Sequence, residues 1–268
     1  MTSRKMRKTG QLVIDTSERF EHLPRAPIVE AVVDIRAQPV EALDEAVVKA
    51  CFEGRLTGYE FLDSQRGIQI EQEFSIAADK PSAPILRDLG WKGLRFRSAD
   101  KKYIAQFNRD GFVLSRLEPY QSWEIFFEET VRLWRVYVEL ARPVEIVRAG
   151  LRFINKIQLP LGELQFERYL HAPPISPKGF DLPFFGFMHR DVLAVPDHPY
   201  AINIIRTIQP TTTGSATRLS LIIDIDAFTA HAFPFDEALL KRRLLEMRWL
   251  KNKAFFGSIT RKAKELFL

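Results

Sequence analysis

The sequence has a single cysteine, Cys51, in 268 residues, and this scarcity excludes a disulfide-stabilised fold. Cys51 lies among apolar residues at helical spacing, so we expect a buried structural thiol. The five histidines are scattered, without the spacing of a zinc site. We therefore predict that the chain holds no metal and no cofactor.

Catalytic glycine motifs and long apolar runs are also missing. The sequence contains no phosphate-binding Gly-x-x-x-x-Gly-Lys loop and no Gly-x-Ser-x-Gly nucleophile elbow. No run approaches the roughly eighteen apolar residues of a membrane span, and no apolar signal core follows the basic N-terminus. We expect a cytoplasmic protein without a membrane partner.

Positive charge is concentrated at the two ends of the sequence, although the net charge is only +5. Residues 1–10 carry four basic and no acidic side chains, and residues 241–268 carry nine basic and two acidic ones. The remainder, residues 11–240, therefore has a net charge of −6. The basic ends leave nucleic acid as an alternative partner, although a loose tail and a solvated helix face explain the same charges.

Regular alternation of side chains is clearest over residues 28–36. Apolar residues at odd positions alternate there with Glu30, Asp34 and Arg36. This period of two predicts a strand with one buried and one charged face. The same pattern returns with opposite charge near residue 150, at Arg148, Arg152 and Lys156.

The order of predicted elements is the same in both halves of the chain. In the first half we expect strands over 28–36, 68–76, 94–97, 103–108 and 112–117, with helices over 41–54 and 122–141. In the second half we expect strands over 144–159, 184–193, 200–209 and 217–225, with helices over 164–170 and from Asp236 onward. This order predicts an α+β fold of two repeats, 26–142 and 143–268, whose strands form one largely antiparallel sheet with the long helices on one face. Residues 1–25 are expected to form a flexible basic arm.

The helices carry apolar stripes that predict their buried faces. In the helix over 41–54 the stripe falls at positions 43, 46, 47, 50 and 51. In the helix over 122–141 it consists of Trp123, Phe127, Val131, Trp134 and Val138. The Phe-rich run 180–187 is expected to pack on its own sheet in preference to a partner.

Three segments resemble an uncharacterised, sporadically distributed prokaryotic family. They are Ala26-Pro-Ile-Val-Glu-Ala-Val-Val-Asp-Ile-Arg36, Phe112-Val-Leu-Ser-Arg-Leu-Glu-Pro-Tyr120 and Gly150-Leu-Arg-Phe-Ile-Asn-Lys156. Such patchy distribution accompanies mobile elements, defence islands or toxin–antitoxin pairs, so the resemblance implies a partner-binding role.

The element order also loosely resembles the saddle of the TATA-box-binding protein family. Glu30, Asp34 and Asp224 on the open face would repel phosphate, which disfavours DNA wrapping.

The charged strand faces are the principal candidate site. If the strands that open the two halves adjoin, Glu30, Asp34 and Arg36 share a face with Arg148, Arg152 and Lys156. Arg206, Asp224 and Asp226 are expected nearby. This face is either a structural ladder of cross-strand pairs or a surface for a protein partner or an identical subunit. We predict a non-catalytic accessory protein that binds a partner.

An enzyme is the alternative prediction. Glu71 and Glu73 alternate on one predicted strand, and Arg95 and Arg97 alternate on another. With the Asp224–Asp226 pair, they would suit a Mg²⁺-dependent phosphohydrolase or nucleotide-binding site. The Glu71–Glu73 pair weakly resembles the Glu-x-Glu-x-Lys strand of the triphosphate-tunnel enzymes, but Ser75 stands where that motif has lysine.

Overall fold

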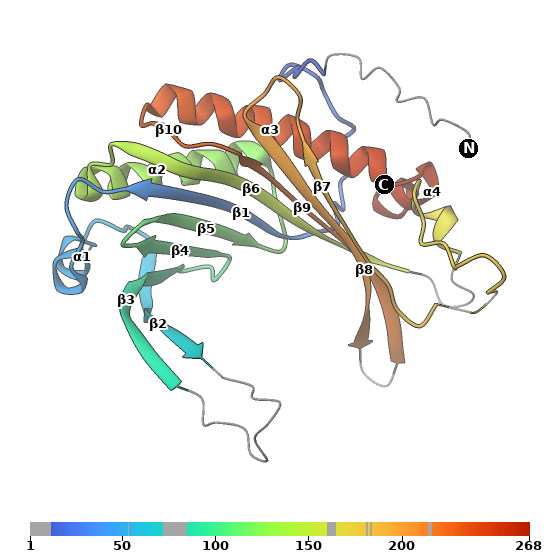
Figure 1. Cartoon of the computed structure of the whole chain (residues 1–268), viewed down its shortest axis with the longest axis horizontal. Coiled ribbons are helices and arrows are strands. Elements are labelled where there is room, and N and C mark those ends of the chain that lie inside the picture. The colour runs from blue at the N-terminus through green and yellow to red at the C-terminus, as the bar shows by residue number, and fades with distance from the viewer. Residues whose placement is uncertain are drawn as a thin grey trace, which may run out of the picture.

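The computed structural model describes residues 12–52, 54–71, 85–159, 165–180, 182, 184–213 and 216–268. In these residues, ten strands form one sheet in which every pairing is antiparallel. The strand order is β2-β3-β4-β5-β1-β6-β9-β8-β7, and β10 pairs with β6 outside this path (Figure 1). The predicted α+β class and antiparallel sheet are confirmed.

The elements follow one another along the chain as two series. The first series is β1 (Ile28–Gln38), α1 (Glu45–Phe52), β2 (Tyr59–Glu71), β3 (Ile85–Ser98), β4 (Tyr103–Asn108), β5 (Gly111–Leu117) and α2 (Trp123–Ala141). The second is β6 (Glu145–Gln158), the 3₁₀ helix η1 (Phe166–Arg168), β7 (Met188–Ala194), β8 (Tyr200–Thr213), β9 (Ala216–Thr229), β10 (Phe233–Pro234), α3 (Glu237–Ser258), α4 (Arg261–Lys264) and the 3₁₀ helix η2 (Glu265–Phe267). None of the helices in the described residues is long and apolar enough to cross a membrane.

The strands that open the two series, β1 and β6, are neighbours at the centre of the sheet. Their antiparallel register sets Val33 opposite Leu151 and Ala31 opposite Phe153. Strands β5, β4, β3 and β2 continue the sheet outward from β1, and β9, β8 and β7 continue it from β6. The expected adjacency of the two opening strands is therefore confirmed.

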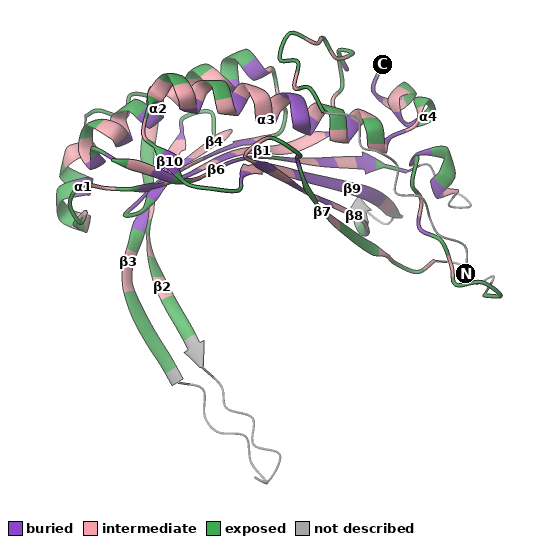
Figure 2. Cartoon of the chain, turned by 45° about the horizontal axis from the view of Figure 1, so that its top comes forward, coloured by how far each residue is buried: buried purple, intermediate pink, exposed green. Residues whose placement is uncertain are grey.

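The hydrophobic core lies on one side of this sheet. Odd-numbered residues of β1, among them Ala31, Val33 and Ile35, are fully buried, whereas the even-numbered ones are half-buried. Helix α3 contacts β6, β8 and β9, and α2 contacts β5. Figures 1 and 2 show both helices on the same side of the sheet. The other face of the central strands carries the charged side chains.

Capping residues mark the starts of the two long helices. The side chain of Asp236 accepts a hydrogen bond from the backbone N–H of Leu239 at 2.6 Å, which confirms the predicted start of α3. Ser122 caps α2 in the same way, accepting from the N–H of Ile125.

The buried face of α2 differs from the predicted stripe. Trp123 and Trp134 are buried as expected, but Phe127, Val131 and Val138 are only partly buried. The other fully buried residues of the helix are Phe126, Thr130, Leu133, Tyr137 and Ala141. Apolar side chains occupy two adjacent rows of this helix, so packing against the sheet decides its rotation.

Helix α1 is shorter than predicted and buries Val48 and Phe52 instead of the predicted stripe. Val47 is 58% exposed, and Cys51 is half-buried. The Phe52 ring lies 4.2 Å from that of Phe107, between ring centroids, and this aromatic packing sets the rotation of the helix.

Several strands are longer than predicted because their outer parts lie away from the core. β2 begins at Tyr59 and β3 at Ile85, and the two form a hairpin that projects from the body (Figure 2). Leu94 and Phe96 are buried at the base of this hairpin. Farther out, the described side chains on both faces are accessible to water, so the sequence there lacks clear alternation. Strand β8 continues to Thr213, beyond the predicted end at residue 209, and η1 replaces the predicted helix over 164–170.

Residues 12–27 lie across the C-terminal part of α3, and we call this segment the strap. The Glu18 carboxylate accepts from Trp249 Nε1 at 2.7 Å and contacts Lys253 Nζ at 2.6 Å. The Phe20 ring stacks on Phe256, 5.6 Å between centroids. The predicted flexible arm, 1–25, thus includes a part that contacts α3, and its first eleven residues lie outside the described residues.

Candidate functional site

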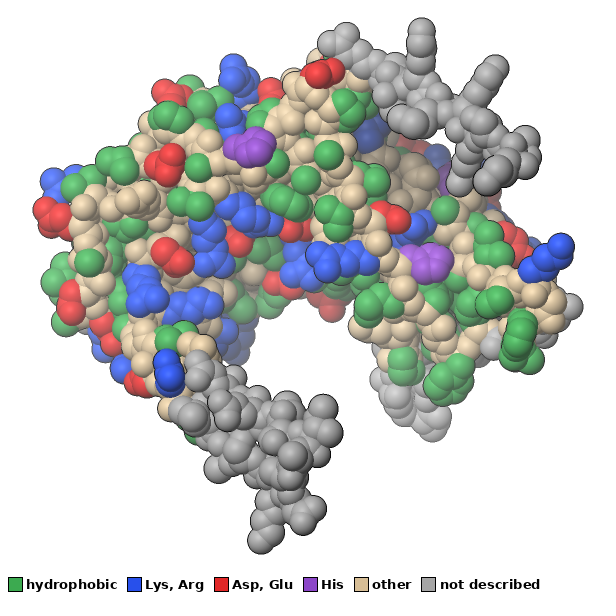
Figure 3. Space-filling model, in the orientation of Figure 1, with side chains coloured by type: hydrophobic (Ala, Val, Ile, Leu, Met, Phe, Trp, Pro, Cys, Tyr) green, Lys and Arg blue, Asp and Glu red, His purple; other side chains and the backbone are tan. Residues whose placement is uncertain are grey.

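Neighbouring strands bring the predicted charged side chains onto one open face. Val32 lies opposite Arg152, and Arg36 lies opposite Arg148, across the β1–β6 pair. Arg152 in turn lies opposite Asp226 on β9. Because directly opposed residues project to the same side of an antiparallel sheet, these side chains share a face. Figure 3 shows Lys and Arg side chains gathered above a hollow on the lower side of the molecule.

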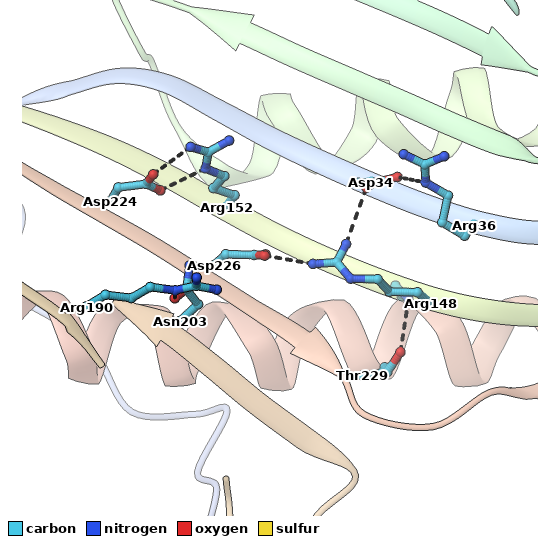
Figure 4. A network of polar contacts seen from close by, with 10 residues as sticks. Asp34, Arg36, Arg148, Arg152, Arg190, Asn203, Asp224, Asp226 and Thr229 are labelled. Carbon is cyan, nitrogen blue, oxygen red and sulfur yellow. Dashed lines mark hydrogen bonds and ion pairs between the residues drawn. The ribbon is translucent and has the colours of Figure 1, made fainter. Parts of the chain in front are cut away.

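Arg148 is the centre of an ion-pair chain across three strands, drawn in Figure 4. Its Nη1 lies 3.3 Å from Asp34 Oδ2 on β1, and its Nη2 lies 2.7 Å from Asp226 Oδ2 on β9. Asp34 also accepts from Arg36 Nε at 2.9 Å. The Arg148 guanidinium stacks over the Phe228 ring, 4.8 Å from its centroid. Arg148 therefore joins both halves of the chain.

A second ion pair connects β6 with β9, the two strands that Arg148 and Asp226 also connect. Arg152 donates from Nε to Asp224 Oδ1 at 2.8 Å and from Nη2 to Asp224 Oδ2 at 2.5 Å, a bidentate arrangement. Asp224 is buried, and Asp226 is mostly buried. Burial raises the pKa of Asp226 above its ordinary value, and the guanidiniums of Arg148 and Arg152 offset part of that rise.

The remaining predicted members of the face are placed differently. Glu30 and Lys156 lie on the charged face, but neither forms an ion pair within the described residues. Arg206 lies on the opposite side of the sheet, because its neighbour Ile205 is the residue opposed to Asp224. Arg206 donates instead to Asp191 Oδ2 at 2.5 Å and to the carbonyl of Ala172 at 3.0 Å. Placing Arg206 in the charged face was wrong.

These contacts have the chemistry of a structural seam. Each of Asp34, Asp224 and Asp226 is engaged by at least one guanidinium, so the negative charge of all three is compensated within the sheet. Cross-strand charge pairs stabilise a sheet by about 0.2–1 kcal/mol each. The network therefore holds the two central strands and β9 in register.

The alternative phosphate site falls only partly within the described residues. Arg95 lies opposite Asp63 and forms an ion pair with it, whereas Glu71 lies opposite Ile85 near the far end of the hairpin. Arg97 lies opposite Glu60. The Glu71 side chain and all of Glu73 lie outside the described residues. Within the described part of the chain, no three His, Cys, Asp or Glu residues are grouped so that they could hold a metal ion.

The basic C-terminal segment is largely neutralised by carboxylates. Seven of its nine cations form ion pairs; they are Lys241, Arg242, Arg248, Lys253, Arg261, Lys262 and Lys264. Their partners include Glu18 and Glu21 of the strap and Glu124 of α2. Residues 241–268 therefore do not present a continuous strip of free positive charge to nucleic acid.

An exposed apolar surface lies at the sheet edge formed by β7, which the charge pattern of the sequence did not indicate. Met188 is 71% and Val192 59% exposed. The Phe-rich run 180–187 precedes this strand, and its side chains differ in burial. Phe184 and Phe187 pack against Phe166, but Phe185 is fully exposed. We call this surface the β7 edge; its exposed apolar residues are Met188, Val192 and Leu193 of the strand and Phe185 just before it.

Comparison with known proteins gives no family for this chain. A scan against protein-family models finds no match, and a search of curated proteins finds none.

Proposed function

We propose that this chain is a non-catalytic binding protein whose β7 edge receives an extended segment of a partner protein. The observation that carries the proposal is that β7 is the last strand of the sheet among the described residues, while its side chains stay exposed along nearly its whole length. An outer strand has backbone N–H and C=O groups without a neighbouring strand, and a partner segment can bond to them.

The side chains of β7 favour such an addition. Natural edge strands are commonly protected by charged residues that hinder pairing. Here Arg190 donates to Asn203 on β8 at 2.8 Å, and Asp191 is held by Arg206. Both charged groups are thus engaged within this chain, and Met188 and Val192 remain for a partner to cover.

A different protein fits this edge better than a second copy of the chain. The antiparallel register that pairs two β7 strands over their full length is centred on Asp191. It sets the Asp191 carboxylate opposite its own copy, and like charges directly opposed are destabilising. A partner segment with apolar residues at alternate positions has no such conflict.

The proposal also includes an internal duplication of the chain and its cellular and genomic context. The mirrored order of strands on either side of β1 and β6 supports a duplicated unit, with repeats over 26–142 and 143–268 and the long helices on one face of the shared sheet. The prokaryotic family resemblance supports a cytoplasmic partner encoded in the same mobile-element, defence or toxin–antitoxin locus.

Co-expression with the products of the neighbouring genes tests the proposal. Complexes are detected by size-exclusion chromatography with light scattering, and affinities are then measured with the purified partner. We expect Met188→Lys/Val192→Lys to weaken binding at least about tenfold, because it places two charges in the contact. The control, Val47→Lys/Val144→Lys, changes two valines that are 58% and 57% exposed elsewhere on the surface. Absence of any complex, or equal binding by both variants, overturns the proposal.

A further inference from the structure

A cavity of about 440 Å³ lies between the strap, α3 and the segment that leads into α2. This volume is within the range of small-molecule sites. Its walls combine polar and charged side chains with aromatic ones, and the aromatic residues include Phe20, Trp123, Trp249, Phe255 and Phe256. The cavity shares no lining residue with the β7 edge, so a ligand in it is independent of the proposed function.

Lys251 lines this cavity and is the unusual charged group in it. The residue is only 8% exposed, and its Nζ lies 3.7 Å from the centroid of the Phe153 ring. Within the described residues, no carboxylate forms an ion pair with this ammonium group. Buried lysines almost always have a charged partner, so an ammonium group without one at a cavity wall is a candidate partner for an anionic ligand.

The carboxylates around the cavity are engaged by other groups. Glu18 binds Trp249 and Lys253, and Glu124 lies 3.6 Å from Arg248. Glu21 pairs with Lys264 at 2.9 Å. Within the part of the chain that the structure describes, each of these acids has a cationic partner, whereas Lys251 has no acidic one.

We propose that this cavity binds a small organic anion, whose carboxylate pairs with Lys251 and whose apolar body packs between the aromatic walls. Trp249 and Phe255 contribute apolar surface to these walls, and Arg248, which pairs with Glu124, lies at the same wall over the Trp123 ring. Burial and, to a smaller extent, the charge of Arg248 lower the pKa of Lys251 to about 7. A bound anion would reverse this effect by favouring the charged amine.

Isothermal titration calorimetry with matched acids and amides tests this site. The probes are benzoate, 4-phenylbutyrate, octanoate and naphthalene-2-carboxylate, each compared with its neutral primary amide at about pH 6, where Lys251 is protonated. We expect at least one acid to bind the wild-type protein about tenfold or more tightly than its amide.

Two variants at Lys251 and one control variant test whether Lys251 causes the tighter binding of the acid. Lys251→Met and Lys251→Gln should each abolish the preference for the acid. Lys241→Met changes a lysine of the same helix that pairs with Glu237 outside the cavity, and it should retain the preference. The inference is overturned if no acid binds better than its amide, or if the preference survives in both Lys251 variants.

Discussion

The guanidinium of Arg148, on the strand that opens the second half of the chain, lies 3.3 Å from the carboxylate of Asp34, on the strand that opens the first. The same guanidinium reaches Asp226 on β9. One side chain on β6 therefore contacts both neighbouring strands, β1 and β9. We interpret the charged face as the place where the two halves of the chain are joined.

A double-mutant cycle on Asp34→Asn and Arg148→Met measures this connection. Both side chains are about a quarter to a third exposed, so we expect a coupling of about 0.5–1 kcal/mol in the free energy of unfolding. Arg148→Met alone should cost more than the coupling, because it leaves the mostly buried Asp226 without its closest cation. Urea unfolding gives all four values, and a coupling indistinguishable from zero contradicts a structural seam.

The two faces of β6 should respond differently to truncation. Leu151→Ala removes a fully buried side chain beneath the helices and should cost about 2–5 kcal/mol of stability. Ile154→Ala, three positions along the same strand, lies on the charged face and should cost less than about half as much. Denaturant unfolding of the two variants compares the faces directly. Similar losses would show that both faces are equally covered.

Lys251 should make stability depend on pH above neutrality. Its pKa is about 7 in the folded protein and near 10.5 when unfolded, so the unfolded chain binds more protons between these values. Stability should therefore rise as the pH increases from about 7 to 9.5, by roughly 2–4 kcal/mol. Above about pH 10 the buried tyrosines oppose this trend, because burial raises the pKa of Tyr120 and Tyr137 above the ordinary value.

Lys251→Met should remove this rise and stabilise the protein most at low pH, whereas Lys241→Met should leave it unchanged. Other ionisable groups also line the cavity; they are Glu18, Arg19, Glu21, His22, Tyr120, Glu124 and Arg248. They are present in the wild type and in both variants, so comparing the pH dependence of the three proteins cancels their contributions. Thermal or urea unfolding across the pH range provides the comparison. An identical pH slope in the wild type and Lys251→Met would refute the buried-amine interpretation.

Local patterns predicted the centre of the fold well. The alternation over 28–36 identified the two faces of β1, and Asp236 marked the start of α3, because these signals depend on neighbouring residues. The rotation of α2 and the side of the sheet that Arg206 faces depend on packing between distant segments. Neither could be derived from apolar periodicity alone.

The two proposed sites were hidden from sequence reasoning for the same physical reason. Lys251 looks like one more cation in a basic segment until the strap, more than 220 residues earlier, covers it. The edge position of β7 follows from the strand order, which places β7 outside β8. Its signal in the sequence was the Phe- and Pro-rich stretch before it, and only the fold shows which of those aromatic residues stay exposed.

Hydrogen exchange of the β7 amides, in the isolated chain and in complex with a neighbouring-gene product, tests the central claim most directly. If the partner adds a strand at this edge, the amides over 188–194 that point away from β8 should exchange at least about tenfold more slowly in the complex, because new inter-strand hydrogen bonds protect them. Amides of β4, inside the sheet, should be unchanged and serve as the internal reference. A complex in which the β7 amides exchange as fast as in the isolated chain would contradict the account.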